Sequence, residues 1–565
     1  GNMKISFNRF GSVAALRRPM WIALAGLWVG QTSWAAPPDA HQFMPDYQGS
    51  QTCAMCHSEQ VAEFMETAHW TWDYTDPDSG QKLGKNTVIN NYCIAVASNE
   101  PRCTSCHAGL GYADKSFDFT DSTKADCLIC HDTTGTYKKF PTDAGHPVYD
   151  EPKEFPPGSG NMWPPPDLDY VSKNAGLSSR ATCGACHFYG GGGDAVKHGD
   201  LDSTLLDPDR ELDVHMGVDG GNFRCAVCHE SENHHISGSR YPNGTTDNQT
   251  CEKCHSATPH ESDRLDAHTS RVACQTCHVP EYARGGKATK MWWDWSKAGQ
   301  KNEDGSSIVI KDENGNPIYD TKKGEFVWEA NVVPEYLWFN GESTYVTLDD
   351  PIEPDQVVTI NRLHGEIGDS NARIFPVKRF TGKQPYDAGA KRLAVPHLFG
   401  KDENAYWKSY DWNKALAAGM EYVDRTYSGQ LGFVETQMFW IQNHMVAPKE
   451  QALDCADCHV PRGRLDFAAL GYPPDRALAL ETMAGFEIDD IQVATQPLGL
   501  QLKWTGTPGH RYQVQQSDGL SPVSWADAPD GERVAGDTPS ELTWSEDLSA
   551  GVGAGKFYRI IRNQQ

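Results

Sequence analysis

The sequence predicts a mainly α-helical chain with much irregular loop, followed by a small all-β domain. Three observations lead to this prediction. A short Cys-x-x-Cys-His motif recurs eight times, and the 565 residues include 52 Gly and 34 Pro. After Tyr472 cysteine disappears, and apolar and polar residues alternate instead. Only 38% of the residues are hydrophobic, so we expect something other than aliphatic side chains to fill much of the interior.

Residues 1–36 are predicted to be a signal peptide that follows a two-residue scar, Gly1-Asn2. Basic residues precede a short apolar stretch, and Ser33-Trp-Ala35 provides the small residues of a cleavage site. An uncleaved membrane anchor is the alternative, but the stretch is about half as long as a membrane span requires. We therefore expect a periplasmic protein with no membrane span, and an extracellular location stays open.

The net charge of −26 comes without any long Lys/Arg block, which argues against nucleic acid as a partner. An acidic surface instead predicts a basic docking face on a redox partner, such as a cytochrome or a quinol dehydrogenase. The sequence is also compatible with an oligomer.

The repeated motif uses 16 of the 17 cysteines. Chance would produce roughly 0.02 copies in a chain of this composition. The eight copies are Cys53/Cys56/His57, Cys103/Cys106/His107, Cys127/Cys130/His131, Cys183/Cys186/His187, Cys225/Cys228/His229, Cys251/Cys254/His255, Cys274/Cys277/His278 and Cys455/Cys458/His459.

This spacing is typical of covalent haem c attachment. Two thiols form thioethers with the haem vinyl groups, and the adjacent histidine binds the iron as proximal ligand. Structural zinc is the alternative, but zinc sites do not require a histidine after every second cysteine. The sequence therefore predicts eight covalently bound haem c groups, which would form the core of the helical part.

Iron with two axial ligands requires distal groups as well. If most of the irons carry electrons, about seven of the remaining histidines should be distal ligands. His41 and His510 lie outside the haem-dense region and are weaker candidates. The stronger candidates are His69, His146, His198, His215, His234, His235, His260, His268, His364, His397 and His444.

The predicted organisation has three parts after the signal. Residues 37–480 form the octahaem domain, and turn signals with short apolar runs predict a β-rich insertion at about residues 299–360. Aromatic spacing in residues 404–423 and 430–445 predicts a helical hairpin near the last haem. Residues 485–565 are predicted to form a β-sandwich similar to fibronectin type III modules.

Two segments lie outside the haem pattern. Cys93 belongs to no motif, and a lone thiol of this kind is either buried and inert or reactive. Asp194 and Lys197 follow the glycines 190–193, which would let the backbone approach a cofactor closely. A flexible loop with a surface ion pair is the alternative for this second segment.

These segments resemble the octahaem tetrathionate reductases, a family related to hydroxylamine oxidoreductase and pentahaem nitrite reductase. The resemblance covers roughly residues 51–461. It rests on Thr87-Val-Ile-Asn-Asn-Tyr-Cys93, Asn99-Glu-Pro-Arg-Cys103-Thr-Ser-Cys-His107, Asp126-Cys-Leu-Ile-Cys-His-Asp-Thr-Thr-Gly-Thr-Tyr137, Gly190-Gly-Gly-Gly-Asp194-Ala-Val-Lys197-His198-Gly-Asp and Val272-Ala-Cys-Gln-Thr-Cys-His278.

The resemblance implies that the haem on Cys103 and Cys106 is catalytic, with His107 proximal and Lys197 as the distal ligand. Its pocket would be lined by Asn90, Cys93, Asp194 and Lys287, although Lys290 stands close to Lys287 in the sequence.

The function implied is reduction of a small anionic substrate, with tetrathionate first and nitrite or hydroxylamine next. The alternative is a non-catalytic electron conduit between periplasmic or extracellular redox partners, which could be polymeric. Oxidation of hydroxylamine requires a tyrosine cross-linked to the catalytic porphyrin, and no tyrosine here is identifiable as that residue.

Overall fold

The computed structural model describes residues 40–76, 80–238, 250–481, 490–495, 498–506, 511–517, 525–535, 540–547 and 557–563. The predicted signal peptide and His510 lie outside these residues. Within them, no helix is both long and apolar enough to cross a membrane.

The expectation of a mainly α-helical chain was wrong, because strand is as abundant as helix. Most of the helices are short, and seven of the thirteen described contain residues of a Cys-x-x-Cys-His motif. Their bounds are α1 Ser50–Met65, α2 Ala68–Thr71, α3 Glu100–Cys103, α4 Leu128–His131, α5 Leu168–Lys173, α6 Arg180–His187, α7 Cys225–Cys228, α8 Asp263–His268, α9 Cys274–His278, α10 Tyr406–Ser409, α11 Trp412–Tyr422, α12 Cys455–Cys458 and α13 Pro474–Glu481.

A nine-stranded sheet is the largest element of the fold. Seven strands follow the order β13-β17-β15-β7-β10-β9-β8, and β11 and β16 also pair with β15. The strands are β7 Thr289–Asp294, β8 Val309–Lys311, β9 Pro317–Asp320, β10 Gly324–Glu329, β11 Glu335–Phe339, β13 Val358–Thr359, β15 Arg373–Asp387, β16 Arg392–Leu393 and β17 Leu431–Ile441. The β-rich segment expected at residues 299–360 therefore lies within a sheet that also recruits strands on both sides of it.

The helical hairpin predicted for residues 404–445 is only half present. Residues 406–422 are helical, but residues 431–441 form β17, which pairs with β15 over its whole length. In β17 every second side chain is buried, including Val434, Thr436, Met438 and Trp440. That period of two is typical of a strand, and a pattern based on the aromatic residues alone misses it.

The remaining elements are short. They are the strand pairs β1 Tyr74–Thr75 with β2 Lys82–Leu83, β3 Lys153–Glu154 with β4 Met162–Trp163, β5 Ser231–Glu232 with β6 His235–Ile236, and β12 Ser343–Tyr345 with β14 Asn361–Leu363, and the 3-10 turns Ala40–Phe43, Thr104–Cys106, Ser122–Lys124, Ser203–Leu206, Cys251–Lys253, Trp295–Lys297 and Lys449–Gln451.

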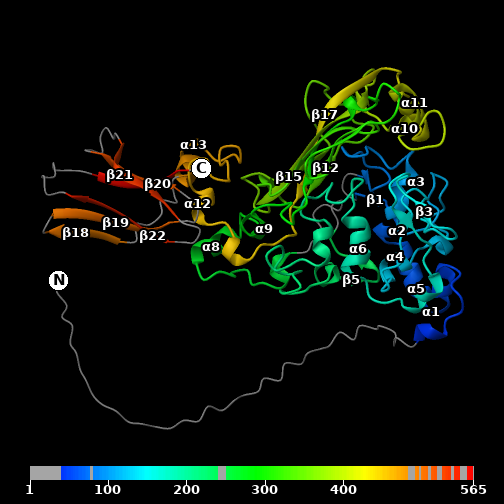
Figure 1. Cartoon of the computed structure of the whole chain (residues 1–565), viewed down its shortest axis with the longest axis horizontal. Helices are drawn as coiled ribbons and strands as arrows, with labels where there is room; N and C mark the ends of the chain where they lie inside the picture. The colour runs from blue at the N-terminus through cyan, green and yellow to red at the C-terminus, as the bar shows by residue number, and fades with distance from the viewer. Residues whose placement is uncertain are drawn as a thin grey trace, which may run out of the picture.

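The apolar core is distributed unevenly. One large cluster covers the sheet and packs Trp293, Trp295 and Phe380 against α10 and α11. Around the N-terminal motif helices, by contrast, the clusters contain only four to six buried residues each. Figure 1 shows these helices at one end of the molecule and the sheet rising from its middle. The motif-bearing part therefore lacks an aliphatic core of its own, as expected if haems fill it.

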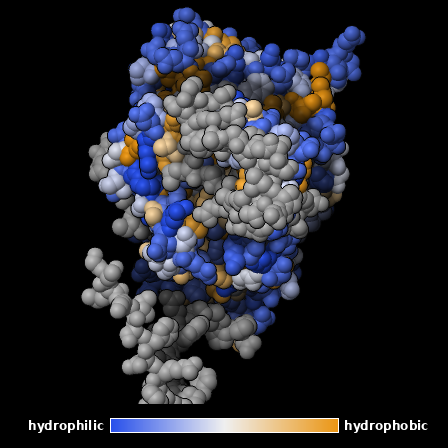
Figure 2. Space-filling model, turned by 90° about the vertical axis from the view of Figure 1, so that its left-hand side faces the viewer, coloured by the Kyte–Doolittle hydropathy of each residue, from blue (hydrophilic) through white to orange (hydrophobic). Residues whose placement is uncertain are grey.

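The C-terminal part contains two three-stranded antiparallel sheets, β18-β19-β22 and β21-β20-β23. Their strands are β18 Asp490–Thr495, β19 Leu498–Gly506, β20 Arg511–Ser517, β21 Ala526–Val534, β22 Ser540–Asp547 and β23 Phe557–Asn563. Trp504, Tyr512 and Trp544 are buried together. The end of the molecule seen in Figure 2 is mostly hydrophilic among the residues that the figure colours, with apolar side chains in scattered groups.

Candidate functional site

The eight attachment motifs form one connected series. The cysteine side chains of neighbouring motifs lie close enough to shift one another's pKa in the pairs Cys53–Cys127, Cys106–Cys186, Cys183–Cys225 and Cys251–Cys274. The pairs Cys130–Cys183, Cys228–Cys254 and Cys277–Cys455 are close enough to interact electrostatically. The series runs from the first motif through the third to the eighth, and the second motif joins it as a branch at the fourth.

The motif cysteines differ in how far the surrounding protein covers them. Cys56 is exposed, and so are Cys228, Cys254 and Cys455, whereas Cys458 is buried. For Cys56 the reason is its place on the outer face of α1, where every residue from 55 to 60 is exposed. Because a thioether needs only a sulfur that reaches a vinyl group, attachment at Cys56 stays a prediction.

Seven motif histidines lie opposite a second histidine from elsewhere in the chain. The ring centres are 6.0–6.5 Å apart in the pairs His57–His41, His187–His69, His131–His234, His255–His215, His229–His444, His278–His260 and His459–His268. Metal–imidazole bonds are about 2 Å long. Two imidazoles on opposite sides of one iron therefore have ring centres about 6 Å apart.

Hydrogen bonds hold many of these rings by their Nδ1 atom. His131, His229 and His459 bond the backbone carbonyl oxygens of Gly176, Ser237 and Leu480 at 2.7, 2.9 and 2.9 Å. On the opposite side, His234, His260 and His444 bond the carboxylates of Glu63, Asp266 and Asp200 at 3.0, 2.9 and 3.2 Å. An engaged Nδ1 fixes the tautomer and leaves the Nε2 lone pair for a metal.

These observations fit a covalently bound haem c. Each motif offers two thiols and an imidazole, and burial lowers the pKa of His131, His187, His229 and His278, which favours the neutral ring that a metal requires. For His187 the pKa falls to about 3. The sparse apolar clusters around the motifs leave the haems to fill the space between them.

His107 is the exception among the motif histidines. It is fully buried, and its ring contacts Trp70, Trp72, Tyr112, Phe117 and Phe119. Among the residues that the structure describes, no histidine ring lies opposite it. Its Nε2 bonds the carbonyl oxygen of Trp70 at 2.5 Å, while its Nδ1 is buried without a hydrogen-bond partner. Burial lowers its pKa to about 3, so the ring is neutral.

A buried lysine fixes the backbone of His107. The Lys139 ammonium donates to the carbonyl oxygens of His107 and Gly109 at 2.6 and 2.8 Å, and it forms an ion pair with Asp126 at 3.0 Å. These three acceptors match its three N–H groups. The position of the ring is therefore set by the backbone as well as by the aromatic side chains around it.

Cys93 lies in a tight loop beside this motif. Asn90 closes the loop, since both its backbone N–H and its Nδ2 donate to the carbonyl oxygen of Ile94. The thiol of Cys93 interacts electrostatically with Cys103, and it faces Gly192, where an added Cβ would come within 3.7 Å of the sulfur. Asn90 thus shapes the loop, and the half-buried thiol faces the 190–193 glycine loop.

Lys197 emerges from the same glycine loop. Its stem runs past Gly190, where an added Cβ would meet Lys197 Cδ at 3.0 Å. Its amine lies 4.5 Å from the centre of the Trp440 ring, and its carbonyl oxygen accepts a 2.9 Å hydrogen bond from the hydroxyl of Tyr92. The residue next to Cys93 therefore holds the backbone of Lys197.

Asp194 and Lys287 form an ion pair at 2.9 Å beside this loop. Asp194 also accepts hydrogen bonds from the backbone and hydroxyl of Ser203. Burial opposes ionisation of Asp194, but the bonds from Lys287 and Ser203 outweigh it and hold the pKa of the carboxyl below its usual range. Lys290, the neighbouring candidate, is instead buried on β7 with its amine over the rings of Trp293 and Phe326.

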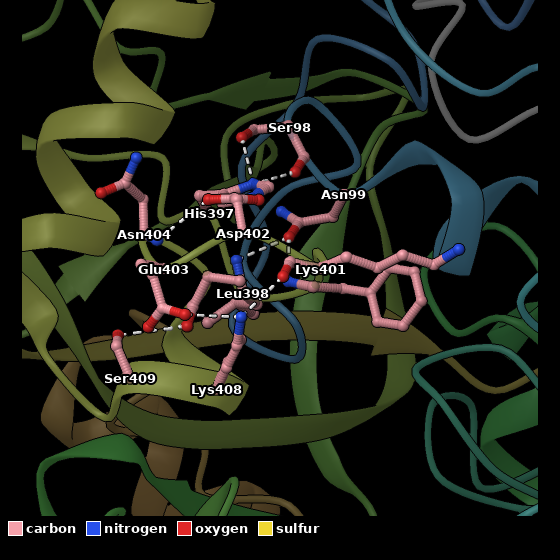
Figure 3. Close-up of polar contacts among 12 residues, drawn as sticks. Ser98, Asn99, His397, Leu398, Lys401, Asp402, Glu403, Asn404, Lys408 and Ser409 are labelled. Carbon is pink, nitrogen blue, oxygen red and sulfur yellow. Dashed lines mark hydrogen bonds and ion pairs between the residues drawn. The ribbon is translucent and has the colours of Figure 1, made fainter.

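Five of the predicted distal histidines face no motif histidine among the ring contacts described. His397 has both nitrogens engaged, by Ser98 and by Asp402 (Figure 3). His364 bonds Thr344, and His146 bonds Tyr149. His198 packs against Trp440, and His235 is exposed on β6.

Sequence reasoning gave little weight to His41, which faces His57. Its distance from the haem-dense region was the reason, although only a short stretch separates it from the first motif. Lys378, Thr289 and Trp440, which surround Lys197, carry no spacing signal at all, because they come from three strands of the sheet.

Comparisons with known proteins agree with this picture. The family model described as "Cytochrome c554 and c-prime" matches residues 52–132, and the one described as "Cytochrome c bacterial" matches residues 290–462. An uncharacterized protein of Archaeoglobus fulgidus is 23% identical over 225 residues, which are 33% of this chain and 75% of that protein.

A solved structure gives a stronger match. The octaheme cytochrome c from Shewanella oneidensis is 43% identical, with a TM-score of 0.69, over 78% of this chain and 97% of that one. The matched chains share a multihaem fold with covalently bound haem c. By this match the chain belongs to the octahaem c-type cytochromes of the tetrathionate reductase family.

Proposed function

We propose that this chain is a periplasmic reductase of small oxyanions that uses all eight haem sites. Seven haems would have two histidine ligands each and carry electrons, with distal ligands His41, His69, His215, His234, His260, His268 and His444. The eighth, on Cys103 and Cys106, would be catalytic, with His107 proximal and Lys197 distal. The observation that carries this proposal is that His107 alone of the motif histidines has no histidine opposite it in the described chain.

The residues gathered at the 190–193 loop suit an anionic substrate. The haems, when bound, supply single electrons. Lys287 provides positive charge, and Asp194 orients Lys287 through their ion pair. A lysine must lose its proton to bind a metal, so it is a ligand that an incoming substrate can displace.

Tetrathionate is the first candidate substrate, because Cys93 adds a nucleophile to this charged pocket. Attack of the Cys93 thiolate on the central S–S bond forms a cysteine–sulfur bond and releases one thiosulfate. Two electrons then cleave the new S–S bond, which releases the second thiosulfate and restores the thiolate. The sum is the two-electron reduction of tetrathionate to two thiosulfates.

Nitrite or hydroxylamine is the next candidate, and the same residues serve it differently. Reduction of a nitrogen oxyanion consumes protons, which Lys197 and the Asp194–Lys287 pair can deliver. Because the carboxyl of Asp194 has a lowered pKa, Lys287 holds the proton of the pair. Cys93 would then be dispensable.

A non-catalytic electron conduit is the second candidate function. The connected series of motifs favours it, because every motif has a neighbour through which electrons can pass. For either function we expect an electron donor with a basic docking face, given the net charge of −26.

The test is turnover of tetrathionate, nitrite and hydroxylamine with a reduced viologen dye. Lys197→Ala and Cys93→Ala are compared with wild type and with His146→Ala, whose histidine bonds Tyr149, at equal haem content. We expect Lys197→Ala to lower turnover by about 100-fold or more, as loss of a catalytic group does. Cys93→Ala should abolish tetrathionate turnover but spare nitrite. Equal dye oxidation by all variants, without substrate preference, would leave the conduit.

A further inference from the structure

The backbone that carries Lys197 is held by the sheet. The carbonyl oxygens of the three consecutive residues 195–197 accept hydrogen bonds from side chains of the sheet or from Tyr92. Thr289 Oγ1 donates to Ala195 at 2.6 Å, and Lys378 Nζ donates to Val196 at 3.0 Å and to Lys197 at 3.1 Å. Ala195 has φ of +60°, a conformation that non-glycine residues rarely adopt. The turn is therefore fixed from outside rather than by its own helical or strand bonding.

Lys378 is the centre of this arrangement. It is fully buried on β15, and its third N–H donates to Thr289 Oγ1 at 2.6 Å. Since Thr289 uses its own hydrogen toward Ala195, its oxygen is free to accept from Lys378. Burial lowers the pKa of Lys378, but the three acceptors around its Nζ match the three N–H groups of an ammonium. Each donor and acceptor in the network therefore has a defined partner, which makes its geometry rigid.

The same strands hold the other end of the Lys197 side chain. Trp440, whose ring lies under the Lys197 amine, is the cross-strand partner of Lys378 in the β15–β17 ladder. Directly opposite residues of a ladder point to the same face. Thus Lys378 fixes the main chain of Lys197, and its neighbour Trp440 contacts the amine.

We infer that Lys378 and Thr289 are positioning residues that fix where the amine of Lys197 is presented, and so how readily an incoming ligand displaces it. This inference rests on the proposed function, in which Lys197 is the distal ligand. A turn held at three carbonyls has little freedom to swing the lysine away, so displacement depends on the side chain alone. Loosening the turn makes the amine leave more easily and return less often.

The test uses the full haem-loaded protein and a readout other than turnover. The rate of cyanide binding to the oxidised protein and the low-spin electron paramagnetic resonance spectrum are measured for Lys378→Met, Thr289→Val and Thr289→Ser. We expect Lys378→Met and Thr289→Val to bind cyanide about 10- to 100-fold faster, the usual range for lost support of a metal ligand. Thr289→Ser retains the hydroxyl and should behave like wild type. Thr436→Val, a buried threonine of β17 that bonds only Gly382 in this sheet among the contacts described, is the matched control.

Lys197→Ala separates failure of this inference from failure of the proposed function. If Lys197→Ala changes neither the spectrum nor the cyanide rate, the ligand assignment itself is wrong. If it changes both, but Lys378→Met and Thr289→Val match wild type, the positioning role is overturned. Should Lys378→Met fail to fold, the difference between Thr289→Val and Thr289→Ser decides the question.

Discussion

Seven motif histidines and His107 share one sequence motif but have different surroundings. The seven have a histidine ring 6.0–6.5 Å away, whereas the rings described around His107 include Trp70 and Tyr112 and no second histidine. The motif specifies only attachment and the proximal ligand. The distal side, which the rest of the fold supplies, distinguishes a carrier of electrons from a site open to substrate.

The seven paired motif histidines and His107 also differ in which ring nitrogen is hydrogen-bonded. In four of the seven paired sites a carbonyl or carboxylate engages an Nδ1 atom, among the contacts described. At His107 the bonded nitrogen is Nε2, and Nδ1 is the buried atom without a partner. Two buried lysines belong to this exceptional site, since Lys139 holds the carbonyl of His107 and Lys378 holds that of Lys197. Both sides of the proposed catalytic haem are thus fixed through the backbone.

The largest effect is expected when His107 is given a histidine partner like those of the other seven motif histidines. Lys197→His would give the eighth site a histidine opposite His107 and convert it into a site like the other seven. Imidazole is a stronger iron ligand than a lysine amine at neutral pH, where the amine must first lose a proton. We expect turnover to fall by about 100-fold or more, with haem content unchanged and the electron paramagnetic resonance signal shifted to that of histidine pairs. Retained turnover would show that the distal side does not separate the two kinds of site.

A smaller effect is expected when one of the seven paired motif histidines loses its histidine partner and so resembles His107. His69→Ala removes the ring opposite His187, so one electron-carrying iron loses a ligand. Axial ligands tune haem reduction potentials over about 0.8 V. We expect the reduction potential of the haem that loses its ligand to rise by about 100 mV. Spectropotentiometric titration measures the shift. His146→Ala serves as control, because His146 bonds Tyr149 rather than facing a motif histidine. An equal shift in both variants would contradict the pairing.

The smallest effect concerns the ion pair at the edge of the single-histidine site. Because the pKa of Asp194 is lowered in the folded protein, the pair stabilises the fold above the ordinary aspartate pKa of about 3.9 and loses this contribution as pH falls below it. Lys287 is 43% exposed, so Lys287→Met should cost less than about 1 kcal/mol near neutral pH. Thermal unfolding at neutral and acid pH measures the difference between variant and wild type. A difference that persists in acid would point to lost packing instead of lost charge.

The C-terminal strands and the helices α10 and α11 show which elements a local sequence pattern can predict. Alternation after Tyr472 predicted a β-rich end, and the described residues there form two sheets. The prediction from aromatic spacing was wrong at residues 431–441. It indicated a helix, but burial there follows the two-residue period of a strand. Short amphipathic segments of this kind are decided by their neighbours, and here β15 supplies a strand of 15 residues to pair with.

Burial of the motifs was likewise beyond the reach of spacing. The motif at Cys53 and Cys56 has the same sequence pattern as the one at Cys103 and Cys106, yet Cys56 is exposed and Cys106 is not. The motif determines where the two thiols lie relative to each other on a helical turn. Whether that turn faces the interior depends on which other segments pack over it.

The sequence by itself determined the attachment chemistry, because two thiols and a histidine at fixed spacing lie on one helical turn whatever the rest of the chain does. It also singled out Cys93, Asp194 and Lys197 by resemblance. Only the tertiary structure decided which histidine faces which motif, since partners such as His268 and His459 are far apart in the chain. It also placed Lys378, Thr289 and Trp440 around Lys197, because hydrogen bonds between strands and a turn depend on register and packing, which residue spacing does not encode.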